Sequence, residues 1–171
     1  MESGSDRPGL DSGNAPTTYN LLFVCSGNTC RSPLARAITE RLLGDRGWSH
    51  VRVDSAGTAA VQGAPASAQA VIVAEEESLD LSTHQSKELT PDLLDWADLV
   101  LVMTPSQFEV VAQRGAADKV ALATDFIEGP SSGESVHDPF GGEVSAYRET
   151  YAQLRTAAEA LLARLEPILA P

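Results

Sequence analysis

The sequence predicts an α/β fold in which a single domain of three layers, αβα, holds a parallel four-stranded sheet between helices. Two observations predict it. Short apolar runs alternate with helix-forming segments along nearly the whole chain, and this alternation is typical of parallel strands joined by right-handed helical crossovers. The chain has 171 residues, 43% of them hydrophobic, which is enough for one ordinary core and too little for two.

The chain begins with a segment that does not fit this pattern. Residues 1–18 are rich in Gly, Ser, Pro and Asp and contain no apolar run, so we expect a disordered N-terminal tail rather than a signal peptide, followed by one domain over 19–171. No stretch is long and apolar enough to span a membrane, and two cysteines without an export signal indicate a cytoplasmic protein. The net charge of -12 disfavours nucleic acid and anionic membranes as partners.

The first strand is predicted over 19–25, where a short apolar run is flanked by residues that break secondary structure. A helix follows. Ser32 is a suitable N-cap and Pro33 a suitable first helical residue, and either Gly44 or Gly47 ends the helix.

The remaining elements continue the alternation. In chain order we expect a strand over 51–57, a helix from Pro65 to about Glu77, a short helix from Pro91, a strand over 98–104, a helix from Pro105 and a strand over 119–123. A Gly/Ser/Pro-rich loop over 125–142 precedes a long last helix, which an apolar stripe predicts to pack on one side. That stripe consists of Val144, Tyr147, Tyr151, Leu154, Ala158, Leu161 and Leu165.

The segment VCSGNTCRSP, which follows the first strand, holds the only two cysteines of the chain. Ligands of open α/β sheets bind beyond the carboxyl ends of the strands, where this segment lies. A loop that enters a helix points backbone N–H groups inward and forms a cradle for anions. Gly27 and Asn28 can adopt the positive φ of such a loop, and the fork of Arg31 can hold two oxygens of a tetrahedral oxyanion.

Cys25 lies at the centre of this predicted cradle, where a positive field favours the nucleophilic thiolate. The hydroxyl of Ser32 is able to stabilise that thiolate. The arrangement suits phosphoryl transfer through a covalent cysteinyl phosphate. The alternative is two buried cysteines in a packing loop, and the strand before the loop, the cap after it and the Gly-Asn pair inside it disfavour that alternative. The predicted phosphate-binding residues besides Cys25 and Arg31 are Ser26, Gly27, Asn28, Thr29, Cys30 and Ser32.

The same segment resembles the signature loop of the low-molecular-weight protein phosphatases, in which a cysteine is followed by five residues, an arginine and a serine. Four further segments resemble that family in the family's order: VDSAGT (53–58), LSTHQSKELT (81–90), DLLDWADLVLVMT (92–104) and DPFGG (138–142). The resemblance extends from Tyr19 onward. It implies that 19–171 is a phosphatase catalytic domain and that its strands are ordered 2-1-3-4.

The resemblance also implies roles for single residues. Cys25 would be the nucleophile, Arg31 the clamp for the phosphoryl group, and Asp138 the general acid that protonates the leaving group. Two further residues, Ser55 and His84, would hold the loop asparagine in a strained conformation. No His, Cys and Asp cluster has the spacing of metal ligands, so we expect neither a metal nor a cofactor.

Redox sensitivity is expected from the loop and implied by the resemblance. Cys25 and Cys30 flank one tight turn, so an oxidised Cys25 can be trapped as a disulfide with Cys30.

The identity of the phosphoryl group depends on Thr29 and Phe140. Tyrosine phosphatases of the family usually carry an aliphatic residue before the second cysteine, and a threonine there together with DPFGG resembles the protein arginine phosphatase branch. A phosphoguanidinium is polar and cationic, and Thr29, Asp138 and Phe140 offer it an oxygen, a carboxylate and an aromatic face. We therefore expect phosphoproteins as partners, with phosphoarginine favoured over phosphotyrosine.

Two alternative functions from other classes stay open. Thioredoxin-coupled arsenate reductases share this loop but need further cysteines downstream, and the chain has none after Cys30. The other alternative is a phosphate-binding or redox-sensing module without turnover. Cys25, Arg31 and Asp138 are all present, so nothing in the sequence indicates an inactive enzyme.

Overall fold

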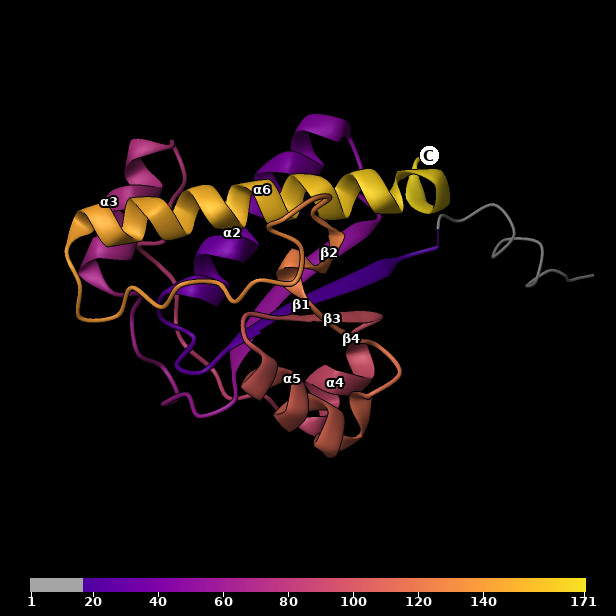
Figure 1. Ribbon diagram of the computed structural model, residues 1–171, viewed down its shortest axis with the longest axis horizontal. Helices are drawn as coiled ribbons and strands as arrows, with labels where there is room; N and C mark the ends of the chain where they lie inside the picture. Colours follow the sequence, from indigo (N-terminus) through magenta and orange to yellow (C-terminus); the bar gives the residue numbers. More distant parts are fainter. Residues whose placement is uncertain (1–16) are drawn as a thin grey trace, which may run out of the picture.

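The computed structural model describes residues 17–171, so the predicted tail over 1–18 lies almost wholly outside the described residues. A four-stranded parallel sheet with the order β2-β1-β3-β4 crosses the middle of the molecule (Figure 1). This confirms the predicted three-layer α/β fold and its strand order. The strands are β1 (Tyr19–Cys25), β2 (Val51–Gly57), β3 (Leu99–Val102) and β4 (Val120–Leu122).

Helices cover both faces of the sheet, as predicted (Figure 1). On one face lie α2 (Arg31–Arg46), α3 (Ala68–Glu76) and the long α6 (Val144–Leu169). On the other face lie α4 (Pro91–Trp96) and α5 (Pro105–Val111), which continues into the π-helical turn η2 (Ala112–Ala116). A 3-10 turn, η3 (Ala123–Phe126), follows β4.

The core is divided by β1, whose side chains alternate between two apolar clusters. Leu21 and Phe23 belong to the cluster that α6 covers, and Leu22 and Val24 belong to the cluster that α4 and α5 cover. The stripe predicted for α6 is confirmed, because all of its members are buried or packed against the first cluster. A central parallel strand buried on both faces explains why residues 21–25 form an unbroken apolar run.

Two predicted helix starts are wrong. Helix α2 begins at Arg31 with Cys30 as its N-cap, and not with Ser32 as the cap. The Ser32 hydroxyl binds other side chains, and Pro33 is tolerated in the first turn because the N–H it lacks would have no partner within the helix.

Helix α3 begins at Ala68, three residues later than Pro65. The segment before it is held extended because the Ser67 amide donates to the Thr29 carbonyl at 3.0 Å. The last two strands are shorter than the predicted 98–104 and 119–123. Strand β3 stops early because the Met103 amide bonds to the Gln107 side chain instead of continuing the ladder.

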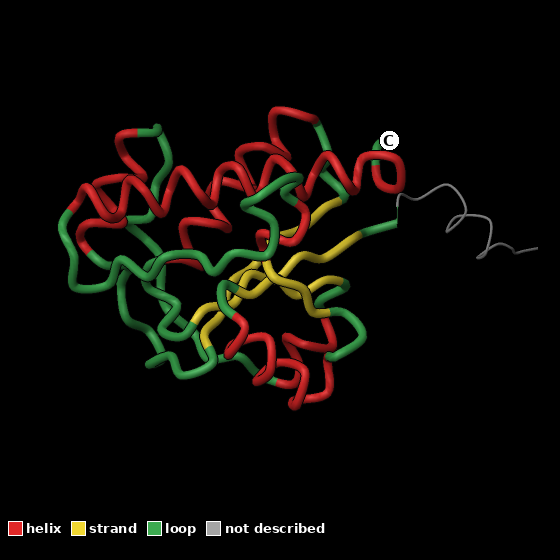
Figure 2. Tube along the Cα trace, in the orientation of Figure 1, coloured by secondary structure: helices red, strands yellow, loops and turns green. Residues whose placement is uncertain are grey.

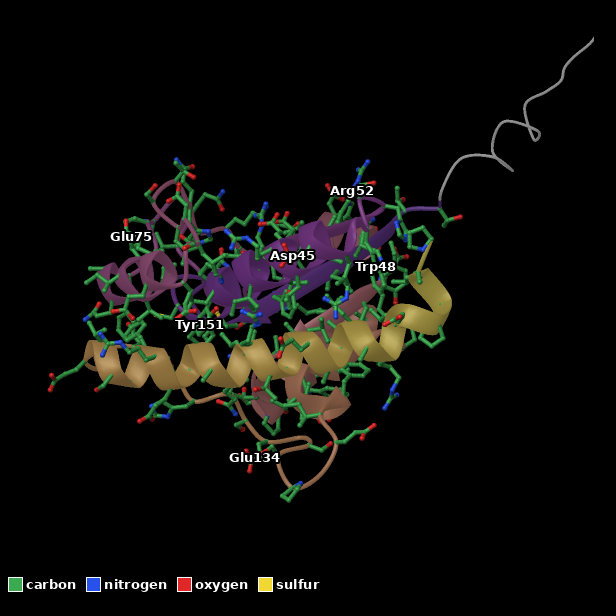
Figure 3. The ribbon with its side chains drawn as sticks, turned by 90° about the horizontal axis from the view of Figure 1, so that it is seen from above. Asp45, Trp48, Arg52, Glu75, Glu134 and Tyr151 are labelled. Carbon is green, nitrogen blue, oxygen red and sulfur yellow. The ribbon has the colours of Figure 1, made fainter. Side chains whose placement is uncertain are left out.

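Long loops gather at one end of the sheet, beyond the carboxyl ends of the strands (Figure 2). Acidic side chains such as Glu75 and Glu134 lie at the periphery of the molecule, away from the sheet (Figure 3). Within residues 17–171, no helix combines the length and the apolar character needed to cross a membrane.

Candidate active site

The loop that joins β1 to α2 has its carbonyl groups turned outward. Five carbonyls between Cys25 and Cys30 accept hydrogen bonds from outside the turn. The donors are the amides of Thr58, Ala59, Ser67 and Leu34 and the imidazole of His84. Since the carbonyls face out, the amide groups between them face the inside, and the N-terminus of α2 points at the same place. This arrangement makes an anion cradle.

Cys25 lies at the floor of this cradle. Its side chain is 2% exposed, and its sulfur lies 2.9 Å from Ser32 Oγ and 3.3 Å from the Asn28 amide, which donates to it. The sulfur therefore accepts one backbone hydrogen bond and lies within hydrogen-bond distance of one hydroxyl.

The side chain of Asn28 orients the Ser32 hydroxyl. Its Oδ1 accepts from the Lys87 amide at 3.0 Å, which identifies the other end of the side chain as the NH₂ group. That group donates to Ser32 Oγ at 2.7 Å and to Ser55 Oγ at 3.0 Å. Because Asn28 occupies a lone pair of Ser32, the single serine proton has two acceptors within reach: the Cys25 sulfur at 2.9 Å and the Ala56 carbonyl at 3.4 Å.

Asn28 has a φ of +57° and is held in that left-handed conformation from behind the loop. The predicted supports are both in contact with it: Ser55 accepts from its amide, and His84 Nε2 lies 2.7 Å from its carbonyl oxygen. Burial lowers the pKa of His84 and the charges of Arg36 and Lys87 lower it further, against the opposing effect of the bond to Asn28. A neutral imidazole that carries its proton on Nε2 satisfies this geometry.

A group of charged side chains fixes the segment behind Asn28. Asp54 accepts from Arg36 Nη1 at 2.9 Å and from Lys87 Nζ at 2.6 Å, and its Oδ1 also accepts from the Ser55 amide at 2.8 Å. These contacts join α2, β2 and the segment that contains His84.

Arg31 and Asp138 form the entrance to the cradle. The Arg31 side chain is buried, donates through Nη1 to the Val136 carbonyl at 3.2 Å, and lies 3.5 Å from the Asp138 carboxylate through Nη2. The loop that carries Asp138 is tied to β3, because the Val136 amide donates to the Met103 carbonyl at 2.8 Å. Asp138 itself is more than half exposed, so its carboxyl is accessible to a ligand.

A cavity of about 210 Å³ opens above the sulfur. It is lined by Cys25, Ser26, Gly27, Thr29, Cys30, Arg31, Asp138 and Phe140. Four predicted site residues do not line this cavity and lie behind the loop. They are Asn28, Ser32, Ser55 and His84. In the described part of the chain, no group of three or more His, Cys, Asp and Glu residues could hold a metal ion.

Three residues that were not predicted as site residues contact the loop: Gly57, Gln107 and Tyr147. Gly57 must lack a side chain, because a Cβ atom there would lie 2.4 Å from the Ser26 carbonyl oxygen. Gln107 donates to Ser26 Oγ at 3.1 Å. For Gly57, its place at the end of a strand beside the predicted loop was an available signal.

Tyr147 was predicted only as a packing residue of the last helix. Its hydroxyl lies 3.4 Å from the Cys30 sulfur, which also lies 3.4 Å from Ser67 Oγ. Burial and the contact with Cys30 raise the pKa of Tyr147 to about 12, so its hydroxyl stays protonated. Both cysteines are free thiols in this structure.

Comparisons with known proteins identify relatives of this chain. The family model of the low molecular weight phosphotyrosine protein phosphatases matches residues 20–168. Protein-arginine-phosphatases of Geobacillus stearothermophilus and Bacillus subtilis are each 36% identical, over 86% of this chain and 97% of theirs. A probable low molecular weight protein-tyrosine-phosphatase of Ralstonia nicotianae is 32% identical over the same shares.

Solved structures are similar as well. The arginine phosphatase from Geobacillus stearothermophilus has a TM-score of 0.78 at 36% identity, covering 87% of this chain and 94% of that one. A low molecular weight protein tyrosine phosphatase from Bacillus subtilis has a TM-score of 0.79 at 34% identity, covering 87% and 98%.

Proposed function

The chain belongs to the low molecular weight phosphotyrosine protein phosphatase family, and we propose that its domain over 19–171 hydrolyses phosphoproteins through a cysteinyl phosphate at Cys25, with phosphoarginine as the preferred substrate. One observation carries the proposal: the buried Cys25 sulfur lies within hydrogen-bond reach of Ser32 and the Asn28 amide, at the floor of an inward-facing ring of backbone N–H groups. A nucleophile inside an oxyanion site suits phosphoryl transfer through a covalent intermediate.

In the first step, the phosphoryl oxygens bind the loop amides and the guanidinium of Arg31. They displace Asp138 from Arg31, which frees its carboxyl to face the leaving group. The Cys25 thiolate attacks phosphorus, an S–P bond forms and the P–N bond of the phosphoguanidinium breaks. Asp138 gives its proton to the departing nitrogen.

In the second step, a water molecule attacks the phosphorus of the cysteinyl phosphate. The Asp138 carboxylate accepts a proton from this water, the S–P bond breaks, and inorganic phosphate leaves. The Cys25 thiolate is regenerated, stabilised again by Ser32 and the Asn28 amide. The same carboxyl thus acts as acid and then as base.

Two features support phosphoarginine. Thr29 and Phe140 both line the cavity, so a hydroxyl and an aromatic face are available to a cationic, polar leaving group. Two relatives at 36% identity are named protein-arginine-phosphatases.

Phosphotyrosine is the second candidate. The exposed ring of Phe140, 72% accessible, could pack against a phenol. Other relatives are named low molecular weight protein-tyrosine-phosphatases.

The decisive experiment compares phosphoarginine and phosphotyrosine peptides of one sequence. We expect a burst of one dephosphorylated product per Cys25 under rapid mixing, a higher kcat/KM for phosphoarginine, and no turnover by Cys25→Ser, which retains phosphate binding. Thr29→Ile should lower phosphoarginine turnover by about ten- to a hundredfold and raise phosphotyrosine turnover, since isoleucine gives a polar leaving group no partner. Preference for phosphotyrosine with an unchanged ratio in Thr29→Ile would refute the arginine assignment, and turnover by Cys25→Ser would refute the covalent mechanism.

A further inference from the structure

We propose that Ser26, oriented by Gln107, is a second specificity-determining residue that contacts the leaving group beside Thr29. The inference rests on the proposed function, because it concerns how the same cavity distinguishes phosphoarginine from phosphotyrosine. It assigns a role to Gln107, a buried polar residue of α5 that takes no part in the two chemical steps.

Gln107 is held rigidly between β3 and the loop. Its side chain is 4% exposed, and its Oε1 accepts from the Met103 amide at 2.9 Å. A backbone amide can only donate, so the opposite end of the side chain is the NH₂ group, which donates to Ser26 Oγ at 3.1 Å. The Gln107 backbone is fixed as well, because its amide donates to Thr104 Oγ1 at 3.3 Å.

This bond determines what the Ser26 hydroxyl can offer to a ligand. A serine oxygen has two lone pairs and one proton. Gln107 occupies one lone pair, so one lone pair and the proton remain, and both must point away from Gln107. Ser26 lines the cavity and is exposed, whereas the Cys25 sulfur is buried below it. The hydroxyl therefore lies on the outer side of the site, where the leaving group sits.

The two candidate leaving groups use such a hydroxyl differently. A guanidinium carries several N–H donors, each of which loses water on entering the cavity and needs an acceptor. The free lone pair of Ser26 meets that need, in addition to the Thr29 oxygen. A phenyl ring has no donor at this position. Removal of the Ser26 hydroxyl should therefore cost phosphoarginine more than phosphotyrosine.

The test is a double-mutant cycle read as a ratio of specificities. The kcat/KM values for phosphoarginine and phosphotyrosine peptides are measured for the wild type, Ser26→Ala, Gln107→Met and the double variant. Ser26→Ala should lower the phosphoarginine-to-phosphotyrosine ratio by about tenfold, and Gln107→Met by about threefold. In the Ser26→Ala background, Gln107→Met should change the ratio by less than about 1.5-fold. The matched control Gln113→Met, at an exposed position of the following turn, should leave the ratio unchanged.

The possible results separate three cases. An unchanged ratio in Ser26→Ala overturns the role of Ser26. If Gln107→Met changes the specificity ratio equally in both backgrounds, the claim that Gln107 acts through Ser26 is overturned. A general distortion of the loop would give this result, because removing one hydroxyl does not relieve such a distortion. This conclusion does not depend on how much thermal stability the variants lose. Absence of turnover in the wild type would instead refute the proposed function.

Discussion

Asn28 makes three side-chain hydrogen bonds that hold the loop, which makes its replacement a sharp test. The residue is fully buried, has a φ of +57°, and makes side-chain bonds to Ser32, Ser55 and the Lys87 amide. Asn28→Gly removes these bonds and keeps the left-handed conformation available. Asn28→Ala removes them and adds the strain of a Cβ atom at positive φ.

The magnitudes follow from these contacts. Three side-chain hydrogen bonds at about 1 kcal/mol each give a loss of roughly 3 kcal/mol in the free energy of unfolding for Asn28→Gly. The strain in Asn28→Ala adds about 1 kcal/mol. Both variants should lower kcat by at least about tenfold, because Ser32 is no longer oriented toward the Cys25 sulfur.

Urea denaturation gives the free energies of unfolding, and hydrolysis of an aryl phosphate gives kcat. Ser78→Ala is a matched control, since Ser78 is exposed and also has a positive φ, of 62°, but lies outside the site. It should lose less than about 1 kcal/mol and keep full activity. A loss below about 1 kcal/mol in Asn28→Gly, with kcat near that of the wild type, would refute the reasoning about this network.

Four further changes test other parts of the site. Asp138→Asn should slow turnover of poor leaving groups by about 10²–10⁴-fold and of activated aryl phosphates much less, and a uniform small loss would indicate a structural turn. Peroxide should inactivate the wild type reversibly, and Cys30→Ser should recover less activity after reductant because Cys25 then has no partner thiol; equal recovery would contradict this. The pKa of His84 is lowered on folding, so the unfolded chain binds a proton at this residue before the folded chain does as the pH falls. The free energy of unfolding of the wild type should therefore decrease below about pH 6.5, and His84→Gln should lack this decrease. Gly57→Ala should reduce both stability and kcat, since its Cβ would meet a loop carbonyl at 2.4 Å; a variant as stable and active as the wild type would contradict the close approach.

The fold and the loop could be predicted because their signals are local. A short apolar run predicted β1, and the loop residues that surround Cys25 are neighbours in the sequence. The start of α2 was predicted wrongly because the Ser32 side chain is used elsewhere in the loop. Ser32 is a good N-cap by residue type, but its hydroxyl bonds to Cys25 and Asn28, which a propensity rule does not take into account.

The contacts that could not be predicted join distant parts of the chain. Gln107 and Ser26 are 81 residues apart, and Tyr147 and Cys30 are 117 apart. Nothing in the pattern around Gln107 distinguishes it from a surface glutamine at the start of a helix. Tyr147 fits an apolar stripe, which predicts that its ring is buried but does not predict which group its hydroxyl contacts.

The contacts of Asp54 have a consequence for how this protein behaves at high concentration. Strand β2 is at the edge of the sheet, and an unpaired edge is a template for aggregation through strand addition. Here the Ser55 amide is occupied by the Asp54 carboxylate, and the Gly57 amide and carbonyl are occupied by Lys87 and Leu89. The carboxyl-terminal half of β2 therefore offers an incoming strand few free backbone partners, and one of the carboxylates behind the Cys25 loop also covers part of this edge of the sheet.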